Sequence, residues 1–455
     1  MTFPIRGLDK AALTAVALAA QLAIVPQAHA QSNEELRKMV AELKARVEQL
    51  EAKSKATEDA GPPVDRDEFN RIKIKAEALE DQKEAAGFKG LKISGYMDPS
   101  YIYNREQNRA GFQFLNRVSD DGYNYDNSYL GTAAIDFQKE MEGGTKWRLT
   151  LMPNRGAGSI ADSAGNSIVH EASVSVPLGD LQTRLIAGQI PDWSGYEYIQ
   201  ANTTKLVTRG LLLDFTEPTA YTAAGMEIIR GNWDVKWVLG NFNRTKQVAN
   251  RRSPVFAYRA DYAKGEFSGF GFAGVEGKIA NFSTGTDTRL DLFEADAYFI
   301  RGDLTLQGQV GVGRQKDAAI TPDPITGNPR DAQWWGVSAL AAYKFVPRWE
   351  ATARLDYINN SKNGGGLLQY STADGRNGIG PDANLGCSTA WVDGCDVGAN
   401  RYALAIGLSY LFNASTTIKT EYRIDRATQP VFLNTKDGTY SKSNQLLGAS
   451  VVVSF

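Results

Sequence analysis

Long apolar runs, cysteine, histidine and an excess of basic residues are absent or scarce in this sequence of 455 residues. Beyond the N-terminus no apolar run reaches the roughly 20 residues that a membrane-spanning helix needs, which excludes a helical membrane protein. A formal net charge of -2 provides no basic surface for nucleic acid, so we expect no such partner. With two histidines and two cysteines there is no credible zinc set, and we expect neither a metal nor a cofactor.

Glycine and aromatic residues, in contrast, are plentiful. The chain has 44 Gly, 19 Tyr, 19 Phe and 8 Trp. Many short alternating strands, with glycine at the turns and aromatic rings at two membrane interfaces, have this composition. The composition therefore favours a β-barrel of the outer-membrane type.

The first 30 residues have the pattern of a secretory signal peptide. Arg6 and Lys10 precede an apolar stretch over 12–25, and Ala28-His29-Ala30 forms a small-x-small cleavage site. The apolar stretch is interrupted by Gln21 and is too short to span a bilayer. We predict a signal peptide over 1–30, with an uncleaved anchor as the alternative.

Residues 31–60 have a helical period. Leu36, Val40, Leu43, Val47 and Leu50 recur at spacings of four and three, which predicts a coiled-coil helix, with a lone amphipathic helix as the alternative. A linker and a second helix are expected over 61–90. We place the helical segment in the periplasm, where it could contact the cell wall.

From residue 91 onward the apolar period changes from 3.6 to 2, as expected for β-strands. Seven short turns alternate with eight long polar connections, which separate about sixteen strands. We expect the long connections near 104–127, 154–167, 191–219, 245–253, 281–289, 316–332, 359–399 and 427–442. Long loops at one end and both termini at the other predict an all-β fold, a 16-stranded antiparallel transmembrane β-barrel over 91–455.

Aromatic residues on the apolar face of the strands lie beside the short turns. This position predicts a girdle of rings at the periplasmic interface. The predicted members are Phe137, Trp147, Trp233, Phe299, Phe345, Trp349, Phe412 and Phe455.

The opposite face of the strands is charged. Such a face would be costly to bury in a dry interior, so we expect it to line a water-filled lumen. The predicted pore-lining residues are Arg148, Arg184, Lys236, Arg259, Arg354, Asp356, Lys419, Glu421 and Arg423. Because the two signs are nearly balanced along the walls, the sequence does not indicate whether anions or cations are preferred.

The third long connection, 191–219, is predicted to fold into the lumen as a constriction loop. It carries Asp192, Glu197, Asp214 and Glu217 together with an apolar triplet, 211–213, that should not lie free in solvent. Its carboxylates would oppose the basic wall residues and create a transverse field. An extra hairpin, with 208–217 as a strand, is the alternative.

Two remaining features concern covalent and catalytic chemistry. Cys387 and Cys395 lie in the longest connection and are expected to form a disulfide in an exported chain. His170, in phase with apolar outward residues, is expected to point toward lipid, and without a base beside a nucleophile we expect no enzymatic activity.

Four segments, 78–104, 136–151, 168–193 and the closing VVVSF, carry a family resemblance. They resemble a proteobacterial family of unknown function that comprises predicted outer-membrane proteins. More loosely, the plan resembles trimeric porins that carry a periplasmic coiled coil. The resemblance implies a barrel but supplies no catalytic or binding residue.

We therefore expect an outer-membrane porin that allows passive diffusion of small hydrophilic solutes. The expected partners are outer-membrane lipid and lipopolysaccharide, and two further copies of the chain in a homotrimer. A structural outer-membrane protein or adhesin with no open pore is the alternative.

Overall fold

The chain divides into two compact units, Met1–Gly87 and Phe88–Phe455. The structure, a computed structural model, describes residues 70–75, 77–78, 90–115, 130–152, 168–244, 246–247, 249, 251–281, 284–368, 379–387 and 393–455. In the first unit, residues 70–75 and 77–78 are helical. The predicted signal peptide and coiled coil lie outside the described residues. Among the helices that are described, none has the length and apolar character to cross a membrane.

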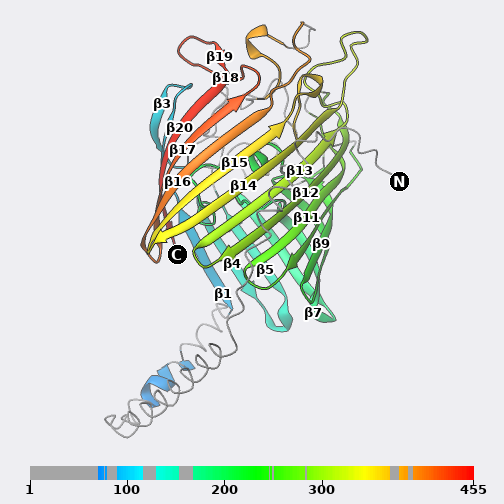
Figure 1. Cartoon of the computed structure of the whole chain (residues 1–455). Coiled ribbons are helices and arrows are strands. Elements are labelled where there is room, and N and C mark those ends of the chain that lie inside the picture. Colours follow the sequence, from blue (N-terminus) through cyan, green and yellow to red (C-terminus); the bar gives the residue numbers. More distant parts are fainter. Residues whose placement is uncertain are drawn as a thin grey trace, which may run out of the picture. The chain divides into compact units, whose positions relative to one another are not determined.

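The second unit is a closed antiparallel β-barrel (Figure 1). The first barrel strand is split into β1 (Leu91–Met97) and β2 (Ser100–Asn104), and the second into β3 (Arg109–Gln113) and β4 (Ala133–Glu140). Both halves of the first strand pair with the last strand, β20 (Ser443–Ser454), which closes the ring. With the split strands counted once each, the barrel has sixteen strands, as predicted.

The remaining strands pair with their neighbours in chain order. They are β5 (Lys146–Leu151), β6 (Val169–Leu178), β7 (Asp180–Pro191), β8 (Ala220–Arg230), β9 (Trp233–Phe242), β10 (Val255–Ala263), β11 (Ser268–Ala280), β12 (Asp287–Arg301), β13 (Leu304–Gln315), β14 (Ala332–Val346), β15 (Trp349–Asn359), β16 (Arg401–Asn413) and β17 (Thr416–Ala427). A small hairpin of β18 (Phe432–Leu433) and β19 (Tyr440–Ser441) stands between β17 and β20.

The predicted alternation of short and long connections is confirmed. All seven short turns lie where the sequence places them, and five of them contain glycines with positive φ, among them Gly231 at 58° and Gly302 at 57°. Such backbone favours glycine, which has no Cβ to clash. The first long connection differs from the prediction, because β3 lies inside it and pairs with β2.

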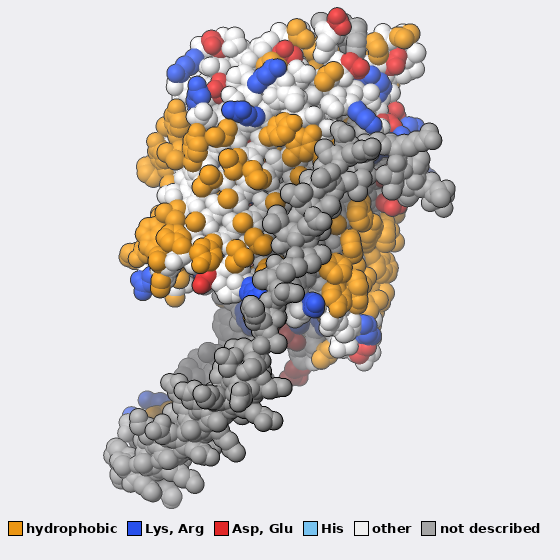
Figure 2. All heavy atoms as spheres, in the orientation of Figure 1, with side chains coloured by type: hydrophobic (Ala, Val, Ile, Leu, Met, Phe, Trp, Pro, Cys, Tyr) orange, Lys and Arg blue, Asp and Glu red, His pale blue; other side chains and the backbone are white. Residues whose placement is uncertain are grey.

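Side chains alternate between two faces along each strand. In β15, exposed Trp349, Ala351, Ala353 and Leu355 alternate with buried inward residues. Figure 2 shows the outward hydrophobic side chains gathered in a band on one face of the barrel, with charged side chains above and below it. Six of the eight predicted girdle rings are exposed: Trp233, Phe299, Phe345, Trp349, Phe412 and Phe455.

Candidate functional site

The connection between β7 and β8, residues 192–219, crosses the inside of the barrel. Tyr196 Oη lies 2.7 Å from Ser338 Oγ of β14, and Lys205 Nζ lies 2.8 Å from Glu350 Oε2 of β15. β7 is the fifth strand of the ring and β15 is the thirteenth, half a turn away. The segment, here called the crossing loop, therefore binds the wall opposite to the one from which it starts.

Buried ion pairs fasten the crossing loop to β15. Arg354 Nη1 lies 2.7 Å from Glu197 Oε1, and Arg354 Nε lies 3.0 Å from Asp356 Oδ2. The second oxygen of Glu197 accepts a hydrogen bond of 2.6 Å from the backbone N–H of Gly210. Because the Arg354 side chain is 0% exposed, loss of one partner would leave a buried charge, which is strongly destabilising.

A second set of contacts holds the loop on β17. Glu421 accepts hydrogen bonds from the backbone N–H groups of Val207 and Thr208, both at 2.7 Å. Lys419 Nζ donates to the carbonyl oxygen of Ala201 at 2.6 Å, and Arg423 Nη1 donates to the carbonyl oxygen of Arg209 at 2.6 Å. These side chains satisfy loop backbone groups that would otherwise be buried without partners.

Glycines on the inward face make room for the loop. A Cβ at Gly407 of β16 would lie 2.4 Å from Leu206 Cδ2, and one at Gly448 of β20 would lie 3.2 Å from Val207 Cγ1. Any larger residue at Gly407 would therefore force the Leu206 side chain of the loop to move. The wall and the crossing loop are complementary in shape as well as in charge.

The 208–217 segment contains a short helix, α4 (Leu211–Phe215), in place of the alternative strand. Leu211, Leu212 and Phe215 are buried, and α4 packs on β14 and β15. The barrel wall thus covers the apolar triplet 211–213. The sequence predicts an inward loop because this triplet requires such cover. Asp214 lies on this helix and is half-buried.

The other carboxylates of the loop lie near its two ends. Asp192 accepts a hydrogen bond of 2.5 Å from Tyr221 Oη, and Glu217 accepts one of 2.6 Å from Gln309 Nε2. Burial raises the pKa of Asp192 and of Glu197. Burial raises the pKa of Glu217 well above its ordinary value, and the neighbouring Glu294 adds to this increase.

Most of the predicted pore-lining residues therefore bind the loop. Arg354, Asp356, Lys419, Glu421 and Arg423 point inward as expected, but they are at most 5% exposed. We expected them to face the loop carboxylates across water. In the structure Glu197 and Arg354 are in direct contact, because the loop is long enough to reach the opposite wall.

The four other predicted lining residues lie on β5 to β10. Arg259 donates to the carbonyl oxygen of Trp193 at 2.7 Å and so holds the start of the loop. Arg184 is buried and donates to the carbonyl oxygen of Gly144, in the first short turn, at 2.6 Å. Arg148 and Lys236 remain accessible.

Two ion pairs on this wall are accessible to solvent. The Arg148 side chain is 42% exposed and lies 2.8 Å from Asp136. The Lys236 side chain is 24% exposed and lies 3.1 Å from Asp234. Charged groups in contact with solvent thus occur on the inward face of β4 to β9, away from the wall that the crossing loop covers.

The prediction for His170 is wrong. His170 is buried, and its Nε2 lies 3.2 Å from Gln200 Nε2 of the crossing loop. The register of the pairing between β5 and β6 shifts between Thr150 and Leu151. Thr150 pairs with Glu171 and Leu151 pairs with Val169, so β6 has one more residue than β5 at this point. This β-bulge reverses the alternation at His170 and turns its side chain inward.

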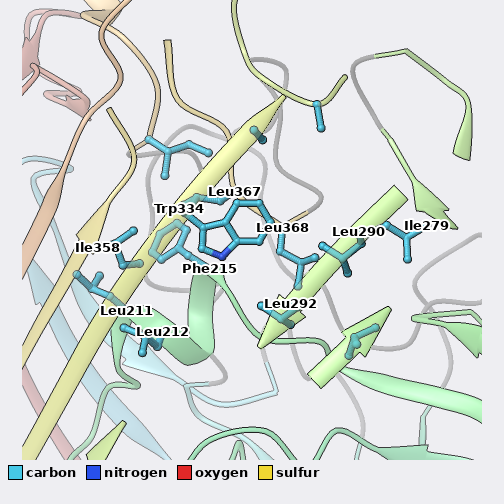
Figure 3. Close-up of a cluster of buried hydrophobic side chains, with 14 of the residues drawn as sticks. Leu211, Leu212, Phe215, Ile279, Leu290, Leu292, Trp334, Ile358, Leu367 and Leu368 are labelled. Carbon is cyan, nitrogen blue, oxygen red and sulfur yellow. The ribbon is translucent and has the colours of Figure 1, made fainter. Parts of the chain in front are cut away.

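The inward face is also apolar near the long-loop end, which sequence reasoning missed. Figure 3 shows Trp334 of β14 beside Phe215 of α4 and Leu367 and Leu368 of the 360–400 connection. Leu292 of β12 belongs to the same buried cluster. The signal was present in strands such as β12 and β14, whose two faces both carry apolar residues.

Three outer connections are tied to one another above this cluster. Cys387 and Cys395 form the predicted disulfide within 360–400. Asp396 pairs with Arg330 of the 316–331 connection at 2.5 Å, and the backbone N–H of Tyr440 donates to Asn384 Oδ1 at 2.8 Å. Among the described residues, no group of three or more His, Cys, Asp or Glu side chains is placed to hold a metal ion.

Known proteins with a similar fold are porins. An anion-selective porin from Comamonas acidovorans matches with a TM-score of 0.51 and 11% identity, covering 80% of this chain and 99% of that chain. The outer-membrane expressed OmpT of Vibrio cholerae matches with a TM-score of 0.50 and 11% identity, covering 80% and 97%. At such low identity the likeness concerns the fold.

The search of curated proteins finds no match. The model of the family described as "Protein of unknown function (DUF3138)" matches residues 17–254 and 270–455, nearly the whole chain. The chain therefore belongs to this family of unknown function.

Proposed function

We propose that the protein is a porin of the outer membrane that allows small hydrophilic solutes to diffuse passively. The observation that carries the proposal is the crossing loop, which is fastened across the barrel by the buried ion pair of Glu197 with Arg354 and the partly exposed pair of Lys205 with Glu350. Buried ion pairs are a poor means of stabilising an interior, because apolar contacts of similar volume usually do as well. Their use here supports a role in fixing the position of a constriction.

The solute path in this proposal runs along the wall opposite to β15 and β17. There Arg148, Asp234 and Lys236 have side chains that are 42%, 31% and 24% exposed. Paired charges of both signs in a narrow aqueous path orient polar solutes and favour hydrophilic ones. Exposed Tyr198 of the crossing loop completes the constriction in this proposal.

Location and assembly are inferred from the outer surface. An apolar outward band with aromatic rings beside the short turns supports insertion in the outer membrane, with the N-terminal segment in the periplasm. β5 has six residues, fewer than the roughly nine that a spanning strand needs, whereas β12 and β14 have fifteen each. The barrel wall is therefore short at β5. A short wall favours contact with a second copy of the chain in the membrane, which supports a homotrimer.

The inward ionisable groups described above bind one another or the crossing loop, which supports a role without catalysis. One observation favours the structural or adhesin alternative. The apolar cluster around Trp334, with the tied outer connections above it, closes part of the long-loop end of the barrel.

Single-channel recording in planar bilayers tests the proposal. We expect stepwise openings from the purified protein, and a shift of the reversal potential toward cations when Arg148→Glu and Lys236→Glu are combined. Both changes reverse the charge of accessible groups on the proposed path. Lys436→Glu, in the outer connection 428–442, is the matched control and should leave the reversal potential unchanged. A silent wild-type barrel would favour the structural alternative.

A further inference from the structure

A cluster of basic side chains lies at the long-loop ends of β9 to β12, here called the basic rim. The 243–254 connection has four basic residues and no acidic residue. The adjoining ends of β11 and β12 add two basic and three acidic residues. The basic members are Arg244, Lys246, Arg251, Arg252, Lys278 and Arg289, and the acidic members are Glu276, Asp287 and Asp291.

Part of the basic rim is neutralised internally. Arg244 Nη1 and Arg251 Nη1 lie 4.0 Å and 3.7 Å from Asp287 Oδ1. Arg289 lies 2.6 Å from Asp291 and 4.0 Å from Glu276. Each of the three acidic members therefore has a basic partner within the cluster.

Three further cations remain available. Lys246, Arg252 and Lys278 are exposed, and no side-chain ion pair or hydrogen bond involves them among the residues that the structure describes. Lys278 is in β11 and pairs in register with Arg289 of β12. The basic rim therefore offers an anion exposed positive charge that no side chain of the described residues neutralises.

This surplus is local. The 316–331 connection has two basic and three acidic residues, and the 360–400 connection has two basic and four acidic residues. The 428–442 connection has two basic residues and one acidic residue, so its surplus is smaller than that of 243–254. The surplus at 243–254 does not follow from a general excess of basic residues, since the whole chain has a net charge of -2. This local surplus of positive charge favours an anionic ligand at the basic rim.

The outward surface just below the basic rim is apolar. Leu239, Phe256 and Phe293 are exposed at 47%, 38% and 41%, and they point away from the barrel. Leu239 pairs in register with Phe256, and Phe256 with Glu276, which is the outward residue next to Lys278. An amphiphile with anionic groups at the height of Lys278 would have its chains on these side chains.

We propose that the basic rim binds the phosphate groups of a phosphorylated glycolipid of the outer leaflet, with its acyl chains along Leu239, Phe256 and Phe293. Charge-assisted hydrogen bonds from Arg and Lys to phosphate oxygens are strong and specific in geometry. The inference rests on the orientation in which the long connections face outward. It does not depend on the passage of solutes.

Binding of purified lipid A to the full mature chain in detergent tests the proposal. The probes are lipid A with two phosphates, the same lipid with none, and inorganic phosphate alone. The variant Lys246→Gln/Arg252→Gln/Lys278→Gln removes the three free cations, and Lys436→Gln/Lys442→Gln removes two exposed cations elsewhere on the rim. We expect the triple variant to bind the bisphosphorylated lipid at least about tenfold more weakly and the control to bind it as the wild type does.

Three outcomes would overturn the proposal. They are equal binding by the triple variant and the wild type, equal loss in the control, and equal binding of the lipids with and without phosphate. Displacement of the lipid by inorganic phosphate at equal concentration would also contradict it, because the acyl chains would then contribute nothing. A silent barrel that binds the lipid would refute the porin but leave this inference intact, so the two failures are distinguishable.

Discussion

The contact between Glu197 and Arg354 provides the sharpest prediction. Glu197→Gln removes one charge of a pair whose side chains are 8% and 0% exposed, while the amide can still accept from Gly210. Removal of one partner of a buried ion pair costs about 3 to 5 kcal/mol. Asp356 still pairs with Arg354, so we take the lower value, about 3 kcal/mol.

Loss of this ion pair should mainly destabilise the bound position of the crossing loop, because Glu197 belongs to the loop and Arg354 belongs to the wall. A change of about 3 kcal/mol shifts the ratio of seated to unseated loop by roughly 100-fold. We expect a larger and more variable single-channel conductance. We also expect faster proteolytic cleavage between 192 and 219.

The matched control is Glu227→Gln. Glu227 is also an inward carboxylate near a cation, 3.7 Å from Lys236, but its side chain is 22% exposed and belongs to the other wall. Its loss should leave the loop seated. If Glu197→Gln gave the same conductance histogram and cleavage pattern as the wild type, the ion pair would not hold the loop and our reasoning would be refuted.

Two further predictions concern stability. Burial and a neighbouring carboxylate raise the pKa of Glu217, so the folded barrel holds a proton there more tightly than the unfolded chain, whose carboxyl titrates near ~4.3. Acidification from about pH 7 to about pH 5 should therefore stabilise the folded barrel through Glu217. Glu217→Gln should remove this contribution to the pH dependence of thermal unfolding in detergent. An unchanged pH dependence in the variant would contradict the prediction. Trp334→Ala should lower the free energy of unfolding by about 3 to 5 kcal/mol through the cavity that it leaves, measured by the same unfolding assay with outward Trp335→Ala as the control.

The sequence predicts the barrel well, because strand alternation and turn chemistry are local properties. In β15 and β17 mostly apolar outward residues alternate with mostly charged inward residues, and these strands lie as expected. Local signals fail where the pairing itself changes the alternation. The β-bulge at His170 depends on the register of a neighbouring strand, which no pattern within β6 discloses.

The candidate site is predicted in part. The apolar triplet in 191–219 indicates an inward loop, since such residues require cover. The partners of that loop cannot be read from the sequence, because Glu197 and Arg354 are 157 positions apart and any inward base could have paired with the carboxylate. Gly407 and Gly448 are the positions at which the wall has no side chain, and Leu206 and Val207 of the loop lie next to them.

The seat of the crossing loop has a consequence for the order of folding. The loop connects the fifth and sixth strands, but its anchors belong to the thirteenth and fifteenth, which are far away in the sequence and on the opposite side of the ring. A partly formed barrel in which β15 and β17 are not yet in place therefore has no Arg354 to pair with Glu197 and no Lys419 to donate to the carbonyl oxygen of Ala201. Contacts of such long sequence separation are slow to form, so we expect the crossing loop to reach its final position only when the distant strands have joined the ring.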